Sequence, residues 1–345
     1  RIPRVCPAYA RIVSIYQSSP DPRPDSDYEP GALRHLVAGN RGRLLDARRT
    51  PVSVVEVRPT VGFVHIRIEG FEDEGAVWRI PLEQADHYQW EPQGPRASEA
   101  DVTEMEQAIE RFDRVLVIEP DESARSATEA RIDVRRTETS SWLAEHSRFL
   151  AAGEPLPDPA TRRGHPLLAA DLEAYMRWAD LWDVEEALTA TYVSNPGSGE
   201  LVKGHRIVIA ELGLADYRGT IVRDPATFAE PWTRDRRAAH IVARLAFLRA
   251  LLGRLGNRKV TLWRGFSTDG RMRRPAGRTF VSTSFSEAVA RSHYQGGAQT
   301  TTRGLVWRAL PVERLFMTYH ETAAMNTMFL EAEAVVLDHR DDRWP

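Results

Sequence analysis

The chain of 345 residues contains one cysteine and two lysines, and it lacks any long run of apolar residues. A single cysteine, Cys6, excludes an intrachain disulfide framework and a cysteine-rich zinc site. No run approaches the roughly 20 apolar residues that a membrane helix needs, so we expect a soluble protein without a membrane span. The formal net charge of −3 is too small to indicate a strongly basic nucleic-acid binder.

Several enzyme signatures are also absent. The segment Gly197–Gly204 looks like a phosphate-binding loop but fails the G-x-x-x-x-G-K-[ST] spacing, and we interpret it as a turn. The ten histidines are scattered without an H-x-x-x-H or H-x-H pair, so we expect no metal. There is no G-x-S-x-G nucleophile motif, and Glu185-Glu186 is most simply solvated charge.

The chain begins with Arg1 and not with methionine. The sequence therefore leaves open whether a targeting segment precedes this residue. Both a cytoplasmic protein and a secreted or delivered effector fit the sequence.

The first half divides into three predicted parts. Residues 1–32 contain six prolines and indicate an irregular arm, with one short strand at Arg11–Tyr16. Residues 33–95 contain β-branched, partly alternating segments, which predict a small SH3-like β-barrel. Residues 96–155 predict a helical connector, opened by a capping box at Ser98–Asp101. The main domain boundary is predicted at the proline-rich linker Gly153–Pro159.

The second half, residues 160–345, predicts helices followed by strands. The expected helices are Leu167–Val193, Arg236–Leu255 and Ser286–Tyr294. The expected strands are Val260–Trp263, Thr279–Thr283, Gly304–Leu310 and Phe329–Leu337. This order favours an α+β domain with a mixed or antiparallel sheet over a doubly wound parallel one.

Three short motifs in this half carry chemistry. An apolar strand ends in Arg264-Gly265, where a guanidinium at the sheet edge suits a pyrophosphate and the glycine admits a ligand to the backbone. Three hydroxyl residues, Ser282 to Ser284, follow a second strand, and Ser286 is placed to cap a helix. On the late strand, alternation places Glu331 and Glu333 on one face, where two carboxylates repel each other unless they serve a function.

The order of these motifs resembles the R-S-E class of ADP-ribosyltransferases, which includes bacterial ADP-ribosylating toxins. The resemblance covers roughly residues 167–337 and implies an ADP-ribosyltransferase-like β-sandwich with flanking helices. It implies NAD as co-substrate and no metal. We recognise no relative for residues 1–152.

The resemblance also implies roles for individual residues. Arg264 would bind the NAD phosphates, and the backbone of Gly265 would bind the nicotinamide amide. Ser282 would contact the nicotinamide ribose, with Thr283 and Ser284 beside it. Glu333 would bond the ribose 2′-hydroxyl, and Glu331 would activate the acceptor. A ring that stacks on nicotinamide would come from Tyr294 or Phe285. The segment Thr318–Met328 would select the acceptor through Tyr319 and Met325.

The leading hypothesis is a mono-ADP-ribosyltransferase that modifies protein arginine, because the motif is Glu-x-Glu. The same transfer to an RNA or DNA base is the second, since Arg34 to Glu69 contains seven arginines against three acids. The two remaining hypotheses are an NAD glycohydrolase, which uses water as the acceptor, and an inactive binding protein. Such enzymes are often toxins, for which an inhibitory antitoxin or immunity protein would be expected.

Overall fold

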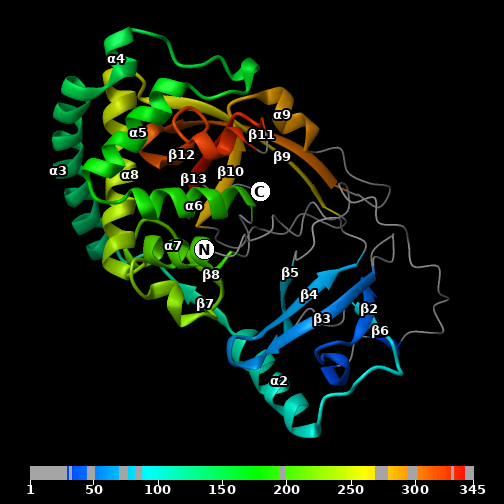
Figure 1. Cartoon of the computed structure of the whole chain (residues 1–345). Helices are drawn as coiled ribbons and strands as arrows, with labels where there is room; N and C mark the ends of the chain where they lie inside the picture. The colour runs from blue at the N-terminus through cyan, green and yellow to red at the C-terminus, as the bar shows by residue number, and fades with distance from the viewer. Residues whose placement is uncertain are drawn as a thin grey trace. The chain divides into compact units, whose positions relative to one another are not determined.

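A computed structural model describes residues 29–30, 33–44, 51–69, 77–82, 88–194, 199–268, 279–293, 302–327 and 330–338. Its architecture is mixed α and β with antiparallel sheets, one of them curled (Figure 1). The chain forms two compact units, the first comprising residues up to Val115 together with Thr220–Asp224, and the second the remainder. The predicted arm, including the strand at Arg11–Tyr16, lies outside the described residues apart from Glu29–Pro30.

The first unit is a six-stranded sheet with the order β1-β6-β2-β3-β4-β5. Its strands are β1 (Glu29–Pro30), β2 (Arg41–Leu44), β3 (Pro51–Arg58), β4 (Phe63–Ile68), β5 (Val77–Pro81) and β6 (Tyr88–Trp90). Helix α2 (Glu99–Phe112) begins at the predicted capping box, since Ser98 and Asp101 bond each other's backbone N–H. Phe112 of this helix joins the apolar core of the sheet.

Arg223 completes the first unit from the middle of the sequence. Its guanidinium donates to the Gly62 carbonyl at 2.9 Å. It also lies over the rings of Phe63 and Phe112, at 5.2 and 5.1 Å from their centroids. Both contacts favour a buried cation, and Arg223 is 4% exposed.

The second unit contains a five-stranded sheet with the order β11-β9-β10-β13-β12 and, apart from the end residues Val115 and Thr220, a two-stranded sheet, β7-β8. The strands are β7 (Val115–Ile118), β8 (Tyr217–Thr220), β9 (Lys259–Thr268), β10 (Phe280–Ser284), β11 (Thr302–Pro311), β12 (Leu315–Thr318) and β13 (Glu333–Leu337). The helices are α3 (Glu122–His146), α4 (Arg148–Ala152), α5 (Pro166–Trp178), α6 (Trp182–Ser194), α7 (Glu200–Glu211), α8 (Arg234–Arg254) and α9 (Glu287–Ser292). Ser286 caps α9 as predicted.

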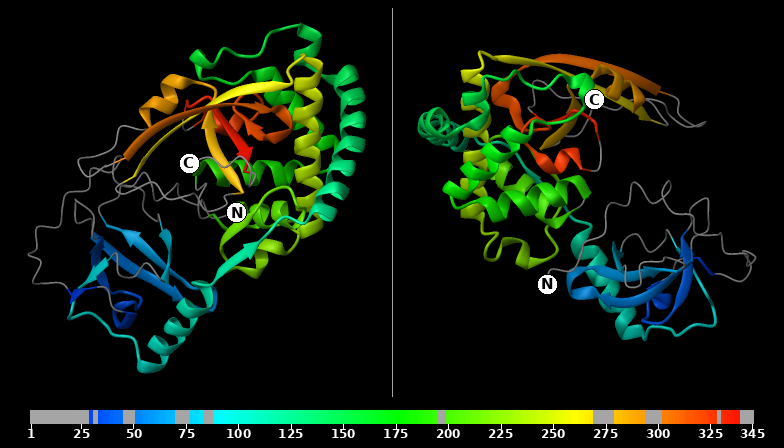
Figure 2. Two further views of the ribbon diagram at one scale, coloured as in Figure 1. Left: turned by 180° about the vertical axis from the view of Figure 1, so that it is seen from behind. Right: turned by 45° about the horizontal axis from the view of Figure 1, so that its top comes forward.

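The division between the units falls at Val115, and the linker at Gly153–Pro159 lies within the second unit. The physical reason is the packing of α3 along α8 (Figure 2). Arg249 of α8 forms an ion pair with Glu129 of α3, and Arg254 donates to the Ser140 carbonyl at 2.7 Å. The predicted helical connector therefore belongs largely with the second unit.

The single helix predicted over Leu167–Val193 is wrong, because the structure has two helices there. Asp180 has a φ of 56°, a left-handed conformation that ends α5. The Leu181 N–H then bonds the Met176 carbonyl at 2.8 Å, which closes the helix end before α6 begins.

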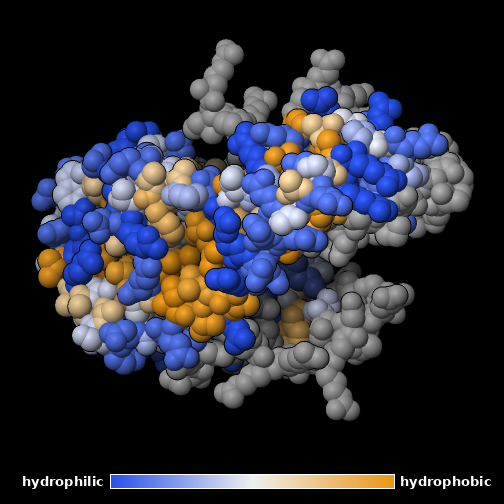
Figure 3. All heavy atoms as spheres, turned by 90° about the horizontal axis from the view of Figure 1, so that it is seen from below, coloured by the Kyte–Doolittle hydropathy of each residue, from blue (hydrophilic) through white to orange (hydrophobic). Residues whose placement is uncertain are grey.

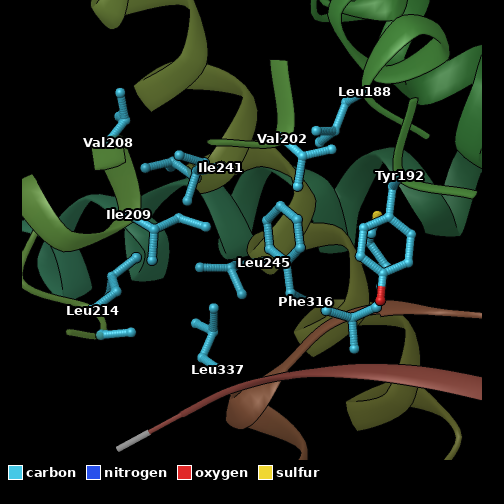
Figure 4. Packing of buried hydrophobic residues seen from close by; sticks show 14 of the residues in the cluster. Leu188, Tyr192, Val202, Val208, Ile209, Leu214, Ile241, Leu245, Phe316 and Leu337 are labelled. Carbon is cyan, nitrogen blue, oxygen red and sulfur yellow. The ribbon is translucent and has the colours of Figure 1, made fainter. Parts of the chain in front are cut away.

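Strand β13 separates two apolar clusters in the second unit. Val335 and Leu337 face a cluster with Tyr192 of α6, while Ala334 and Val336 face a cluster with Leu248 of α8. Figure 4 shows Tyr192 at the edge of the first cluster, with its hydroxyl directed away from α6. Outside the cores, hydrophilic residues cover much of the face that Figure 3 shows.

A chain of buried ionisable side chains crosses the helices of this unit. Glu185, predicted as solvated charge, is 2% exposed and accepts from His240 Nε2 at 2.8 Å. His240 Nδ1 lies 3.1 Å from His205 Nε2, and Arg237 reaches the other nitrogen of His205. Arg244 Nε lies 3.4 Å from the same oxygen of Glu185, Oε2. Helices α6 and α8 are thus joined through buried ion pairs, and α7 joins them through the hydrogen bonds of His205.

Burial and the charges of His240 and Arg237 hold the pKa of His205 well below its ordinary value. Burial opposes ionisation of Glu185, but the Arg244 charge and the His240 hydrogen bond outweigh it and lower the pKa of Glu185. Within the described ranges, no three His, Cys, Asp or Glu side chains are placed to hold a metal ion. In the same ranges, no helix has the length and apolar character required to cross a membrane.

Acid should destabilise the fold through His205. Its pKa is depressed in the folded state, so the unfolded chain takes up a proton below about pH 6.5 while the folded chain does not. The free energy of unfolding should fall by up to roughly 1.4 kcal/mol per pH unit for this histidine below that pH. Urea unfolding at pH 7 and pH 5 measures the fall, which should be smaller in His205→Asn and unchanged in the surface control His146→Asn. An equal fall in wild type and His205→Asn would contradict this account.

Candidate functional site

Pairing of β10 with β13 brings the predicted serine and glutamate together. Ser282 lies opposite Val335, and Ser284 lies opposite Glu333. Directly opposed residues of an antiparallel pair project from the same face, and residues two apart on a strand share a face. Ser282, Ser284 and Glu333 therefore lie on one face of the sheet, with Ser282 exposed and Glu333 half-buried.

The Glu333 carboxylate is held by two hydroxyl groups. The Tyr192 hydroxyl of α6 donates to Glu333 Oε1 at 2.8 Å. The Ser282 side chain also bonds this carboxylate. Burial raises the pKa of Glu333, while the hydrogen bonds from Ser282 and Tyr192 act to lower it. The result is an oriented, partly desolvated carboxylate.

Arg264 lies beside this carboxylate site. Its guanidinium donates to the main-chain carbonyl of Ser282. Burial and Glu333 raise the pKa of Tyr192 well above its ordinary value, and the positive charge of Arg264 acts to lower it. The structure thus brings Arg264, Ser282 and Glu333 together from three strands.

Glu331 is not on the strand, which corrects the prediction that both glutamates project from one strand face. Strand β13 begins at Glu333, and Ala332 between them has a φ of 45°. This left-handed residue breaks the alternation. Ser284 Oγ donates to the Glu331 carbonyl at 2.6 Å and holds the irregular segment.

The Glu331 side chain is directed to a different partner. Its Oε1 lies 3.4 Å from His293 Nε2, at the end of α9. The bond to Glu331 raises the pKa of His293, although partial burial opposes it. The two glutamates therefore have separate environments, one beside tyrosine and serine and the other beside histidine.

Of the remaining predicted ligand residues, few present a side chain to the site. Thr283 is buried and donates to the Ala334 carbonyl at 2.8 Å, on the opposite face. Ser284 supports the backbone before β13, and Gly265 lies in β9 opposite Leu305. Phe285 is half-buried against other rings. Tyr294 lies outside the described residues.

The predicted acceptor-selecting segment is described over Thr318–Thr327, and its two apolar side chains are buried in the core. Tyr319 is 0% exposed and Met325 is 4% exposed. Tyr319 donates instead to the Pro157 carbonyl at 3.0 Å. Neither side chain is available to an acceptor, because the apolar core takes up both.

Other residues of this segment line a pocket of about 620 Å³. His320, Ala323 and Asn326 of this segment line it together with Leu330 and with residues at the start of α5, among them His165 and Pro166. The backbone of Gly164 packs directly against the Tyr319 carbonyl. A side chain at this position would not fit, because its Cβ would lie 2.1 Å from that oxygen. Burial lowers the pKa of His320 to about 3, so its ring is neutral near pH 7.

The glycine-rich segment near residue 200 has no phosphate-binding geometry in its described part. Gly199 is the N-cap of α7, so residues from Glu200 onward are helical where a turn was predicted. Lys203 is 7% exposed and donates to Glu200 Oε1 at 2.6 Å.

Tyr192 and His293 were not found by sequence reasoning. Tyr192 lies within an apolar helix pattern that predicts a core residue. Its ring does pack in the core, while its hydroxyl bonds Glu333. His293 ends a short helix and has no motif around it. The one signal was indirect: a polar-tipped aromatic ring in a core needs a partner for its hydroxyl.

Comparison with known proteins adds no relative. No protein-family model, no curated protein and no solved structure matches this chain.

Replacing Tyr192 with phenylalanine should raise the pKa of Glu333 further. The lost hydrogen bond favours the ionised carboxylate, and its removal is worth about one pKa unit. Carboxyl ¹³C NMR titration measures the shift, with Glu333→Gln to assign the signal. Tyr175→Phe removes another buried hydroxyl, bonded to Thr139, and should leave the titration unchanged. A lowered Glu333 pKa in Tyr192→Phe would contradict this geometry.

Proposed function

We propose that the second unit is a mono-ADP-ribosyltransferase that moves ADP-ribose from NAD to an acceptor and releases nicotinamide. The observation that carries the proposal is the convergence of Arg264, Ser282 and Glu333 on one site, in the sequence order of the R-S-E class. We propose with it an ADP-ribosyltransferase-like fold for this unit and an SH3-like barrel for the first.

The residues of the site have the chemistry that NAD requires. A guanidinium offers paired donors to a pyrophosphate. The Arg264 guanidinium lies beside Ser282, where it would hold the pyrophosphate of NAD. Ser282 is exposed and would meet the ribose, while already bonded to Glu333. Glu333, oriented by Tyr192, would accept from the ribose 2′-hydroxyl.

The transfer breaks the bond between ribose C1′ and the nicotinamide nitrogen. Nicotinamide leaves as a neutral molecule with the electron pair of that bond, and positive charge develops on the ribose. A fixed carboxylate in a partly desolvated site stabilises this charge without reorganising. A lone pair of the acceptor atom then forms the new bond to C1′, and the proton of that atom passes to Glu331.

Separate environments for the two glutamates suit separate roles. Glu333 is the more enclosed and would serve the donor, whereas Glu331 lies outside the strand beside His293 and would serve the acceptor. An arginine acceptor is protonated and must lose a proton to attack. On sequence alone, the Glu-x-Glu motif favours such an acceptor. A toxin or effector of this kind would have an inhibitory partner protein.

Glu333→Gln should lower nicotinamide release from NAD by roughly 10²–10³-fold, because the amide cannot stabilise the cationic ribose. Chromatography of the reaction mixture measures release for wild type and variant. Glu186→Gln, an exposed glutamine replacement on α6, is the matched control and should behave as wild type. Retention of activity within about threefold would reject the electrostatic role of Glu333. No release by wild type would leave an inactive binding protein.

Glu331→Gln should lose transfer while retaining hydrolysis to ADP-ribose. Water needs little activation once the glycosidic bond has largely broken, whereas the acceptor must give up a proton. Nicotinamide release and acceptor labelling are measured side by side with labelled NAD and cell lysate, followed by protease and nuclease digestion. Equal loss of both activities would refute the division of roles. Hydrolysis without labelling by wild type would identify an NAD glycohydrolase.

A further inference from the structure

A row of four residues crosses the five-stranded sheet on the face that carries Glu333. Trp307 of β11 lies opposite Trp263 of β9, Trp263 opposite Ser284 of β10, and Ser284 opposite Glu333 of β13. Opposed residues share a face, so both tryptophans project on the side of the carboxylate. Neighbouring strands lie roughly 4.8 Å apart, which places the tryptophan backbones roughly 10 and 15 Å from that of Glu333.

The outer tryptophan of this row is unusually exposed. Trp307 is 59% exposed, and Trp263 is its one ring partner among the described residues, with centroids 6.1 Å apart. Trp178 of α5 is also exposed, but its ring packs on Trp142 and Tyr175 and lies under the Arg135 guanidinium. Trp178 therefore closes a core, whereas Trp307 presents its indole outward.

The strands that carry the two tryptophans are basic. Together β9 and β11 contain four basic residues and no acidic residue, and by strand alternation two of the four, Lys259 and Arg303, lie on the face of the tryptophans. This contrasts with the net charge of −3 for the whole chain. Arg303 shares the face of Trp307 by strand alternation and is exposed. Figure 2 shows β9 and β11 as the long paired strands at one side of the sheet.

We propose that this face of β9 and β11 binds single-stranded nucleic acid and presents one of its bases to the site at Glu333. A base stacks on an exposed indole whatever its sequence, and basic side chains attract the phosphates. A cationic guanidinium acceptor would meet repulsion on the same strands. The acceptor class is therefore a nucleobase, in place of the protein arginine expected from the Glu-x-Glu motif.

The binding half of this proposal stands on the sheet face alone, and the acceptor half rests on the proposed function. In the acceptor half, a ring nitrogen or exocyclic amine of the base gives its lone pair to ribose C1′ as nicotinamide leaves. Where the attacking nitrogen carries a proton, that proton passes to Glu331, and where a ring nitrogen carries none, the base is left with the positive charge. Neutral base nitrogens need less activation than a guanidinium.

The binding experiment uses the full chain without NAD. Fluorescein-labelled single-stranded RNA and DNA of about 12 nucleotides and mixed sequence are titrated by anisotropy at two salt concentrations. Trp307→Leu should weaken binding at least about fivefold, since a stacked base contributes about 1–3 kcal/mol. Trp307→Phe, which keeps a ring, should restore much of the affinity. Trp178→Leu, the matched exposed tryptophan, should bind as wild type, and thermal unfolding checks that each variant is folded.

A second measurement adds labelled NAD and offers the oligonucleotides and agmatine, a small guanidino compound, as separate acceptors. Labelling of an oligonucleotide, reduced in Trp307→Leu, is the expected result, and the RNA and DNA arms identify which is used. Labelling of agmatine alone, or equal oligonucleotide affinity in wild type and Trp307→Leu, would overturn the proposal. Oligonucleotide binding without any cleavage of NAD would instead overturn the proposed function and leave the binding face standing.

Discussion

The antiparallel ladder between β10 and β13 is the constraint on which the site depends. Its register places Ser284 opposite Glu333 and Ser282 opposite Val335. A shift of one residue would turn Glu333 into the apolar cluster around Leu248, where an ionised carboxylate has no partner. The side-chain volumes of β13 oppose that shift, because the smaller pair, Ala334 and Val336, fills one core and the larger pair, Val335 and Leu337, fills the other.

A second constraint comes from the helices that face this ladder. Tyr192 can donate to Glu333 only while α6 is held at a fixed height over the sheet. Two turns earlier on the same helix, Glu185 is joined to His240 and Arg244 of α8 in a region closed to water. Removing one partner from such a group leaves a buried charge unpaired, which is costly. The pairing therefore orients α6 more strictly than apolar contact alone does.

Local patterns in the sequence were sufficient to predict many elements and the three motifs. The capping serines Ser98 and Ser286, the apolar face of α8 and the Arg264 strand all follow from spacing between near neighbours. What failed depended on distant residues. Glu185 looked like surface charge because its partners His240 and Arg244 lie more than 50 positions away in the sequence. Tyr319 looked available to an acceptor because the core that covers it is built from helices distant in the sequence. The left-handed Ala332 had no signal, since alanine rarely adopts that conformation.

The return of Thr220–Asp224 to the first unit has a consequence for dissecting the protein. Arg223 fills the space beside Phe63 and Phe112 and satisfies the Gly62 carbonyl, yet it is encoded more than a hundred residues after them. A fragment that stops at Val115 would expose those rings and lose the cation that covers them. The first unit is thus discontinuous in the gene, and neither unit can be obtained intact by a single cut of the chain.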